Sequence, residues 1–464
     1  MLVSPSRRTT SMEFDVARCG SPWRAHQHPT PYTGLSLRKT CTKTINTVST
    51  MESFYDRRET RSIDEREAAQ LAELQSLLDR AKANPLHAER IGDGGILSLD
   101  DLAELPLLRK SDLIGIQAGT PPFGGLNLAE IGRMHHVYRS PGPINDYDGT
   151  ESDWWRVGRA LYAAGFRPGD IVHNSFSYHF TPAGMLFDRG AVNIGCTVFP
   201  AGTENTEFQA EAMAVFRASA YTGVPDFLPR LLEKADESAL DTTSLTKACV
   251  SAGPLFPSVR QGLNDRGVGV YQCYVIADLG LIAYETPALE AMVIDEDVLV
   301  EIVRPGTGTP VPDGEVGEVV VTALSHQELP LIRLAIGDLS AIMPGQSPCG
   351  RTGKRLKGWL GRADQTVKVR GMFVHPEQVA RVLEQCGLDA RGRLVVGREG
   401  NRDTMTLHVE HDGPAEGLVA RLESTIKNTF NLRGEVRIEP IGALPNDGKV
   451  IEDKRDTTAQ LSQP

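Results

Sequence analysis

The feature that most constrains the fold of this chain is an alternation of helical and strand patterns between residues 150 and 253. Helical patterns over 154–164 and 183–194 are each followed by a short apolar run typical of a buried strand. Such runs lie at 170–174, 196–200, 218–223 and 248–253. Strands that alternate with helices favour a largely parallel sheet covered by helices. The sequence therefore predicts a large layered α/β domain.

A different pattern follows this alternation. Residues 299–303 and 317–322 are apolar runs around a Pro-Gly-Thr-Gly turn, which predicts antiparallel strands of a small subdomain. Further along, strands are predicted at 367–369, 393–396, 406–410 and 436–438, and helices at 376–385 and 414–430. The predicted fold class is α/β. An N-terminal domain over 51–360 carries the antiparallel β subdomain, and a small C-terminal α+β domain covers 361–464.

The first fifty residues differ from the rest in composition. They are rich in Ser, Thr, Arg and Pro, have Glu13 and Asp15 as their only acids, and contain no apolar run. We predict a disordered leader over 1–50; an organelle transit peptide, or a start placed too far upstream of Met51, are the alternatives. An amphipathic helix is predicted directly afterwards, over 63–83.

Composition excludes several classes of partner. The formal net charge of −11 argues against a nucleic-acid surface, because phosphate backbones require clustered Lys and Arg. No apolar stretch approaches the length of a membrane span. The seven cysteines are scattered, without a Cys-x-x-Cys pair, which is typical of reduced intracellular thiols. We predict a cytoplasmic protein that binds neither nucleic acid nor membrane.

Three short motifs in the last third of the chain place charged side chains at predicted turns. Asp338 follows Gly337 after an apolar segment, where its carboxylate could accept hydrogen bonds from both hydroxyls of a ribose or bond its own backbone. Arg362 and Asp364 lie between two patterned regions, and on their own they are a solvated surface pair. Lys449 follows Gly448, and on its own it is a solvated lysine.

In this order and spacing, the three motifs resemble those of the phenylacetate–CoA ligase family of the adenylate-forming (acyl-CoA synthetase) superfamily. The resemblance extends from about Met51 to Lys454. It implies that the C-terminal domain is a mobile lid.

The resemblance assigns roles to the charged residues. Asp338 would bind the ribose of the adenylate, and Arg362 would lie near ribose and phosphate. Asp364 would be the hinge of the lid, and Lys449 would enter the active site during acyl-adenylate formation. Such a lysine stabilises charge that develops during attack.

Two more segments match the family in part. Tyr274 and Asp278 resemble a Tyr-Gly-x-x-Glu box, in which the aromatic ring stacks on adenine and the acid holds Mg²⁺. Val275 stands where that box has glycine. Ser251-Ala252-Gly253 resembles the adenine-binding loop, with its acid missing.

The phosphate-binding segment departs furthest from the family. Relatives carry a Ser/Thr/Gly-rich loop ending in Gly-Lys, whereas residues 138–144 read Tyr-Arg-Ser-Pro-Gly-Pro-Ile. The two prolines remove two backbone N–H donors, and the lysine is absent. Ser140 and Gly142 are the candidates for contact with phosphate. We predict an altered phosphate loop.

The family resemblance also places the acyl and coenzyme A contacts. Tyr178, His179, Pro225 and Phe227 would line the acyl pocket and suit an aryl or hydrophobic carboxylate, with core packing as the alternative for each. Arg370 and Gly371 would lie where the pantetheine arm enters the site.

The predicted function is that of an AMP-forming acyl–CoA ligase for an aryl or related hydrophobic carboxylate. It would use ATP, Mg²⁺ and coenzyme A, and the family leaves a homodimer open. One alternative keeps adenylation but transfers the product to another acceptor, such as a carrier protein or a cofactor. The other is a non-catalytic relative that binds an acyl or nucleotide ligand, which the altered phosphate loop and Val275 favour.

Overall fold

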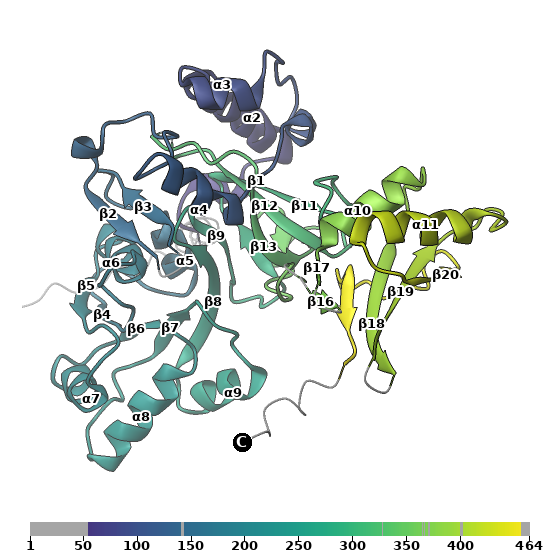
Figure 1. Cartoon of the computed structure of the whole chain (residues 1–464). Coiled ribbons are helices and arrows are strands. Elements are labelled where there is room, and N and C mark those ends of the chain that lie inside the picture. The colour runs from purple at the N-terminus through teal and green to yellow at the C-terminus, as the bar shows by residue number, and fades with distance from the viewer. Residues whose placement is uncertain are drawn as a thin grey trace, which may run out of the picture. The chain divides into compact units, whose positions relative to one another are not determined.

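A computed structural model describes residues 54–140, 143–326, 328–363, 365, 367–369, 372–399 and 402–455 (Figure 1). The chain divides into two units, 1–49 and 50–464. The predicted leader, with Glu13 and Asp15, lies outside the described residues.

The largest sheet has nine strands in the order β14-β15-β10-β9-β8-β7-β6-β4-β5. Its members are β4 Ile171–Asn174, β5 Thr197–Pro200, β6 Ala220–Gly223, β7 Lys247–Val250, β8 Gly269–Ile276, β9 Gly280–Tyr284, β10 Met292–Ile294, β14 Ile342–Met343 and β15 Arg355–Leu356. The five strands from β5 to β8 pair in parallel, and the pairs from β8 onward are antiparallel. The predicted strands and the α/β class are therefore confirmed.

Helices alternate with these parallel strands along the chain. They are α5 Val157–Ala163, α6 Ala183–Asn193, α7 Thr206–Val215, α8 Phe227–Glu237 and α9 Pro257–Asp265. Helix α5 begins three residues later than predicted because the Asp153 carboxylate accepts hydrogen bonds from the N–H groups of Val157 and Gly158. Gly190 of α6 faces α5 so closely that a Cβ there would lie 2.8 Å from the Gly158 nitrogen. Small residues thus bring these two helices together.

A second sheet has the order β1-β13-β12-β11. Its strands are β1 Leu108–Arg109, β11 Val298–Val303, β12 Gly317–Ala323 and β13 Leu334–Ser340. The antiparallel pairs β11–β12 and β12–β13 confirm the predicted antiparallel subdomain. Strand β1 was not predicted; it pairs in parallel with β13 through Leu108 and Leu334. Its carboxyl end therefore lies beside the strand that carries Asp338.

The remaining N-terminal elements surround these sheets. They are η1 Arg57–Thr60, α2 Ile63–Ala81, α3 Pro85–Ile91, η2 Asp100–Glu104, α4 Lys110–Gly119 and η3 Ile131–Arg133, and the hairpin of β2 His136–Arg139 with β3 Asn145–Asp148. The predicted helix after the leader is confirmed, and Ser62 and Glu65 begin it with a reciprocal capping box.

The C-terminal residues build a separate apolar core. Their elements are β16 Val367–Val369, β17 Met372–Val374, α10 Pro376–Gln385, β18 Gly392–Glu399, β19 Arg402–Glu410, α11 Leu418–Phe430, β20 Glu435–Glu439 and β21 Ile451–Asp453. The core is formed by apolar residues of the strands and of the two helices, including Val379, Leu407 and Ile426. The predicted α+β elements are confirmed.

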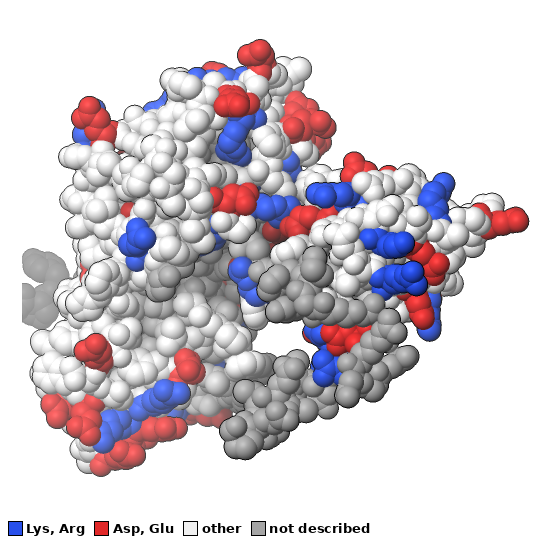
Figure 2. Space-filling model, viewed as in Figure 1, with Lys and Arg blue, Asp and Glu red and all other residues white. Residues whose placement is uncertain are grey.

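The surface carries both signs of charge. Figure 2 shows acidic and basic side chains interspersed over the visible face, so the net negative charge is not gathered in one patch there. Among the helices of the described residues, none combines the length and the apolar character that crossing a membrane requires.

Candidate active site

Asp338 is the centre of a compact hydrogen-bonded cluster. Its carboxylate accepts from the Tyr274 hydroxyl at 2.6 Å, the Arg362 guanidinium at 2.8 Å and the Trp359 indole N–H at 3.1 Å. Gly337, at φ +76°, makes room for this contact, since a Cβ there would lie 2.8 Å from an Arg362 nitrogen. The structure thus joins three of the predicted site residues and adds Trp359.

The donors around Asp338 differ in how easily they can leave. Burial and the Asp338 charge raise the pKa of Tyr274, so its phenol stays protonated and keeps donating. The Arg362 side chain is 57% exposed, whereas that of Asp338 is 12% exposed. Arg362 is therefore the donor that an incoming ligand can displace at the lowest cost, because water already solvates much of it.

Asp278 lies in a second cluster of charged groups. It follows β8 in the turn to β9, and its carboxylate forms an ion pair with the Lys110 ammonium group. The Asp146 carboxyl group of β3 is within hydrogen-bonding reach of Asp278. Burial and the Asp278 charge raise the pKa of Asp146 well above its usual range. Sequence reasoning had missed Lys110 and Asp146.

The segment in place of the phosphate loop is a closed hairpin between β2 and β3. The Ser140 N–H donates to the Ile144 carbonyl at 2.8 Å, and the Ser140 hydroxyl accepts from the Ile144 N–H at 3.2 Å. The Arg139 guanidinium donates to the Asn145 side chain at 2.9 Å. Gly142 lies outside the described residues. The Ser140 N–H and the Ser140 hydroxyl oxygen are therefore both engaged with Ile144.

The candidate adenine loop lies one strand away from Tyr274. Ser251 follows β7, which pairs with β8, and its hydroxyl donates to the Cys273 carbonyl at 2.8 Å. Ala252 has a φ of +62°, and the Gly253 carbonyl accepts from Gln272 at 3.1 Å. These contacts hold the loop against the strand that carries Tyr274.

The four candidates for the acyl pocket have different surroundings. Pro225 is buried against the candidate adenine loop, since a Cβ on Gly253 would lie 3.5 Å from its ring. The Tyr178 hydroxyl donates to Asp188 at 2.8 Å, and His179 is exposed. Phe227 packs on the apolar core around α8. Pro225 therefore lies next to the candidate adenine loop.

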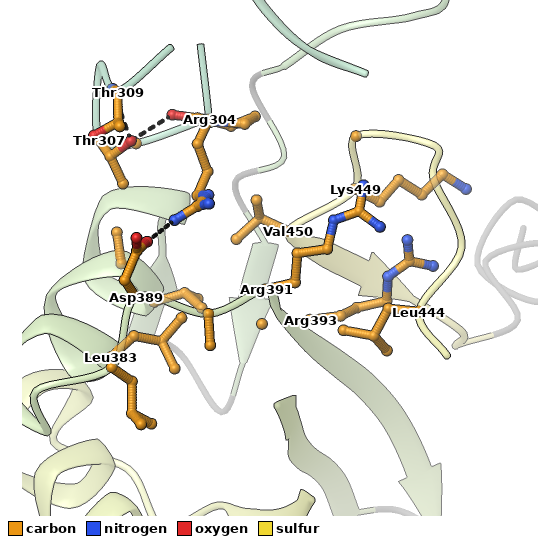
Figure 3. Close-up of a pocket in the computed structure, with 18 of the residues that line it drawn as sticks. Arg304, Thr307, Thr309, Leu383, Asp389, Arg391, Arg393, Leu444, Lys449 and Val450 are labelled. Atoms are coloured by element: carbon orange, nitrogen blue, oxygen red, sulfur yellow. Dashed lines mark hydrogen bonds and ion pairs between the residues drawn. The ribbon is translucent and has the colours of Figure 1, made fainter. Parts of the chain in front are cut away.

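Lys449 lines a cavity of about 620 Å³ (Figure 3). Basic and acidic side chains share its wall, among them Arg304, Glu315, Arg391 and Arg393. Tyr274, Asp338 and Arg362 are not among the residues that line it. Among the described residues, Lys449 forms no hydrogen bond or ion pair with the Asp338 cluster.

Gln365 bonds three backbone groups of the segment around Lys449. The Gln365 amide oxygen accepts from the Val450 and Ile451 N–H groups at 2.5 and 2.7 Å, and its amide nitrogen donates to the Gly448 carbonyl at 2.9 Å. Asp364, the predicted hinge, and Arg370 and Gly371, the predicted pantetheine contacts, lie outside the described residues.

One histidine pair also meets a carboxylate. His135, His136 and Asp148 bring potential metal ligands within 4.8 Å of one another. Asp148, however, accepts from the His136 backbone N–H at 2.6 Å, from Arg189 at 2.6 Å and from Tyr138 at 3.3 Å. Arg189 balances the charge of Asp148. We therefore assign Asp148 a structural role, in which it anchors the hairpin.

A parallel α/β core, an antiparallel sheet that presents an aspartate, and a separate α+β core with a lysine near its end define the adenylate-forming class of enzyme. In agreement, the sequence profile described as AMP-binding enzyme matches residues 154–324. Two solved structures of 2-hydroxyisobutyryl-CoA ligase, both after adenylation, superimpose with a TM-score of 0.63. One is 25% and the other 26% identical to this chain; both cover 87% of it, and the chain covers 92% of each.

Two similar enzymes identify the family within the adenylate-forming class. The phenylacetate-coenzyme A ligase of Pseudomonas putida is 29% identical over 87% of this chain and 97% of that enzyme. The phenylacetate-coenzyme A ligase of Thermus thermophilus is 31% identical over 73% of this chain and 76% of that enzyme. The chain belongs to the phenylacetate–CoA ligase family of AMP-forming acid–CoA ligases.

Proposed function

We propose that this chain activates an aryl or related hydrophobic carboxylate as its acyl adenylate and transfers the acyl group to coenzyme A. The observation that carries the proposal is the Asp338 cluster, where Tyr274 and Arg362 meet the carboxylate of a strand end. The names of the relatives support an aryl acid, since they are phenylacetate-coenzyme A ligases.

In the first half-reaction, a carboxylate oxygen attacks the α-phosphate of ATP and pyrophosphate leaves. Asp338 accepts hydrogen bonds from the ribose hydroxyls, and Arg362, released from Asp338, turns to the phosphate. Lys449 stabilises the negative charge on the attacking carboxylate and the α-phosphate. Because Lys449 makes no hydrogen bond or ion pair with the Asp338 cluster, this step would bring it there by a rotation of the C-terminal core about Asp364.

In the second half-reaction, the thiol of coenzyme A attacks the acyl carbonyl carbon and AMP leaves. The pantetheine arm would enter past Arg370 and Gly371. The two half-reactions share one active site but require different residues around it, and a rotating lid provides both arrangements.

Mg²⁺ fits the residues present. The Asp278 Oδ1 atom is buried and has no hydrogen-bond partner among the described residues, and carboxylate oxygens are the ligands that Mg²⁺ prefers. When bound, the ion would neutralise charge on the ATP phosphates. Asp278 would hold it beside the strand that carries Tyr274.

We also propose that the enzyme works in the cytoplasm as a monomer or homodimer, and light scattering of the purified chain distinguishes these two states. The cysteines of the described residues are free, which supports this compartment.

The test is carboxylate-dependent exchange of pyrophosphate into ATP with a panel of aryl and aliphatic acids. We expect exchange with at least one aryl acid, and a loss of about 10²–10³ in rate for Lys449→Ala, because a donor to developing charge is removed. Lys454→Ala is the matched control, since this lysine is also exposed and lies five residues further on. It should retain the wild-type rate.

The experiment also separates the alternatives. Exchange needs no acceptor, so exchange without coenzyme A consumption would favour transfer to a carrier protein or cofactor. Nucleotide binding without exchange for any acid would contradict the ligase proposal and support the binding protein.

A further inference from the structure

Asn174 is a fully buried amide at the carboxyl end of β4, and its whole hydrogen-bonding capacity is in use. The amide nitrogen donates to the Tyr178 hydroxyl at 2.7 Å and to the Gly184 carbonyl at 2.8 Å. The amide oxygen accepts from the Thr222 hydroxyl at 3.0 Å and from the Phe176 N–H at 3.2 Å. An Asn side chain offers two donor hydrogens and two lone pairs, so these contacts determine its orientation.

The Tyr178 side chain is held both at its hydroxyl and against α6. The hydroxyl accepts from Asn174 and donates to the Asp188 carboxylate at 2.8 Å. The Gly184 backbone lies against the ring, since a Cβ there would be 2.7 Å from two ring carbons. Burial and the Asp188 charge raise the pKa of Tyr178, so the phenol keeps its proton and continues to donate. Tyr178 is nevertheless partly exposed, so part of its ring is left for a ligand.

Tyr178 follows a strand end on the edge of the sheet where the candidate adenine loop also lies. Strands β4, β6, β7 and β8 are neighbours in the large sheet and run parallel (Figure 1). Hydrogen bonds continue across their carboxyl ends, from the Ser175 N–H to the Thr222 carbonyl at 2.8 Å and from the Ser251 N–H to the Gly223 carbonyl at 3.2 Å. In open α/β sheets, ligands bind outside the carboxyl ends of the strands. The loop with Tyr178 therefore belongs to the same binding edge as the loop that begins at Ser251.

The engaged hydroxyl limits how Tyr178 can contact an acid. Its hydrogen atom goes to Asp188, and it already accepts a hydrogen bond from Asn174. The surface that remains for a ligand is the flat, apolar ring. Another aromatic ring packs on such a surface by offset stacking or by an edge contact, whereas a puckered aliphatic ring offers neither.

We propose that Asn174 is a positioning residue for acid selection: together with Asp188, it fixes the Tyr178 ring as the wall on which an apolar aryl group packs. This inference rests on the proposed function and adds Asn174 and Asp188 to it. A ring that is fixed in advance loses less conformational freedom on binding, so affinity for a flat acid depends on both hydrogen bonds. Affinity for the nucleotide does not depend on them, because the hydroxyl of Tyr178 is engaged within the protein.

Equilibrium dialysis of the full chain tests this, with phenylacetate and cyclohexylacetate as probes and the inert nucleotide α,β-methylene-ATP present. We expect Tyr178→Phe to bind phenylacetate about fivefold more weakly, because the ring stays but both hydrogen bonds of its hydroxyl are lost. Affinity for cyclohexylacetate should change little, so the preference for the flat acid narrows. Asn174→Ala should give the same loss, and the double variant no further loss, because both changes act through one ring.

Asn193→Ala is the matched control. Asn193 ends α6 and also donates to a tyrosine hydroxyl, that of Tyr55, at 2.9 Å. This variant should bind both acids with wild-type affinity. If Asn174→Ala does not fold, Asp188→Ala removes the other hydrogen bond of the same hydroxyl, and its loss should likewise not add to that of Tyr178→Phe.

Four results would overturn the proposal: no binding of either acid, unchanged phenylacetate affinity in Tyr178→Phe, losses that add in the double variant, or equal weakening of both acids and the nucleotide. The last result would give Asn174 a structural role alone. Pyrophosphate exchange reports the ligase function separately. Exchange in a protein whose acid affinity ignores these variants would reject only the positioning role, and the expected affinities without exchange would reject only the ligase function.

Discussion

At the scale of single residues, Asp338 is paired before any ligand enters. Three donors hold its two oxygens, and they come from β8, from the segment before Arg362 and from Arg362 itself. The carboxylate is therefore fixed in place by neighbours that differ in exposure. Trp359 is one that sequence reasoning missed, because a single tryptophan in a loop has no motif to mark it.

We expect Trp359→Phe to lower kcat/KM for ATP roughly fivefold, since the loss of one hydrogen bond to Asp338 costs about 1 kcal/mol. Trp359 is 49% exposed, so the unfolding midpoint should change little. Steady-state kinetics with ATP varied, alongside thermal unfolding, checks both points. An unchanged ATP dependence would show that Trp359 does not position Asp338.

At the scale of secondary-structure elements, local sequence patterns predicted the helices, whereas contacts between distant parts of the chain were not predictable. Helix α10 was predicted at its observed limits because Pro376 opens it and an amphipathic pattern follows. Strand β1 has two residues and is defined by its partner β13, a contact that no local pattern encodes. The same holds for Lys110 and Asp146, which meet Asp278 from 168 and 132 positions away in the chain. Long-range pairing therefore set the limit of sequence reasoning.

Strand β4 buries a histidine with consequences for stability. His173 is fully buried, its Nε2 lies 3.0 Å from the Gln209 side-chain oxygen, and burial lowers its pKa from 6.5 to about 4. The unfolded chain takes up a proton near pH 6.5, whereas the folded chain does so near pH 4. The stability that His173 contributes is therefore complete above pH 6.5 and is lost as the pH falls toward 4.

We expect the unfolding free energy of the wild type to fall with acidification more steeply than that of His173→Phe, by up to about 3 kcal/mol between pH 6.5 and 4. Urea denaturation at a series of pH values measures the difference. His179→Gln is the control, because His179 is exposed and its removal should leave the slope unchanged. Parallel curves for wild type and His173→Phe would contradict the assignment.

At the scale of the whole molecule, two apolar cores must cooperate in one reaction. One core surrounds the nine-stranded sheet, and the other is built from residues 367–451. Helical and strand periodicity predicted the elements that build these two cores. The approach of Lys449 to the active site stays a prediction, because it depends on how the C-terminal core is oriented and no local pattern encodes that.

Gln365 ties the Lys449 segment to the start of the C-terminal core. We expect Gln365→Ala to raise amide hydrogen exchange at Val450 and Ile451 by about tenfold, because both N–H groups lose their acceptor. The adenylation rate should fall as the position of Lys449 becomes less defined. Mass-spectrometric exchange measures the first effect, with the exposed Gln385→Ala as control. Unchanged exchange would show that backbone contacts alone hold the segment.

The occupied state of Asp338 has a consequence for nucleotide choice. A ligand that displaces Arg362 removes a charged hydrogen-bond donor from the Asp338 carboxylate. Unless the ligand donates comparable hydrogen bonds, binding free energy is lost. A ribonucleotide offers two sugar hydroxyls for this exchange, whereas a 2′-deoxynucleotide offers one. If Asp338 binds the ribose as proposed, we expect the enzyme to prefer ATP over dATP, because dATP returns one hydrogen bond fewer to this carboxylate.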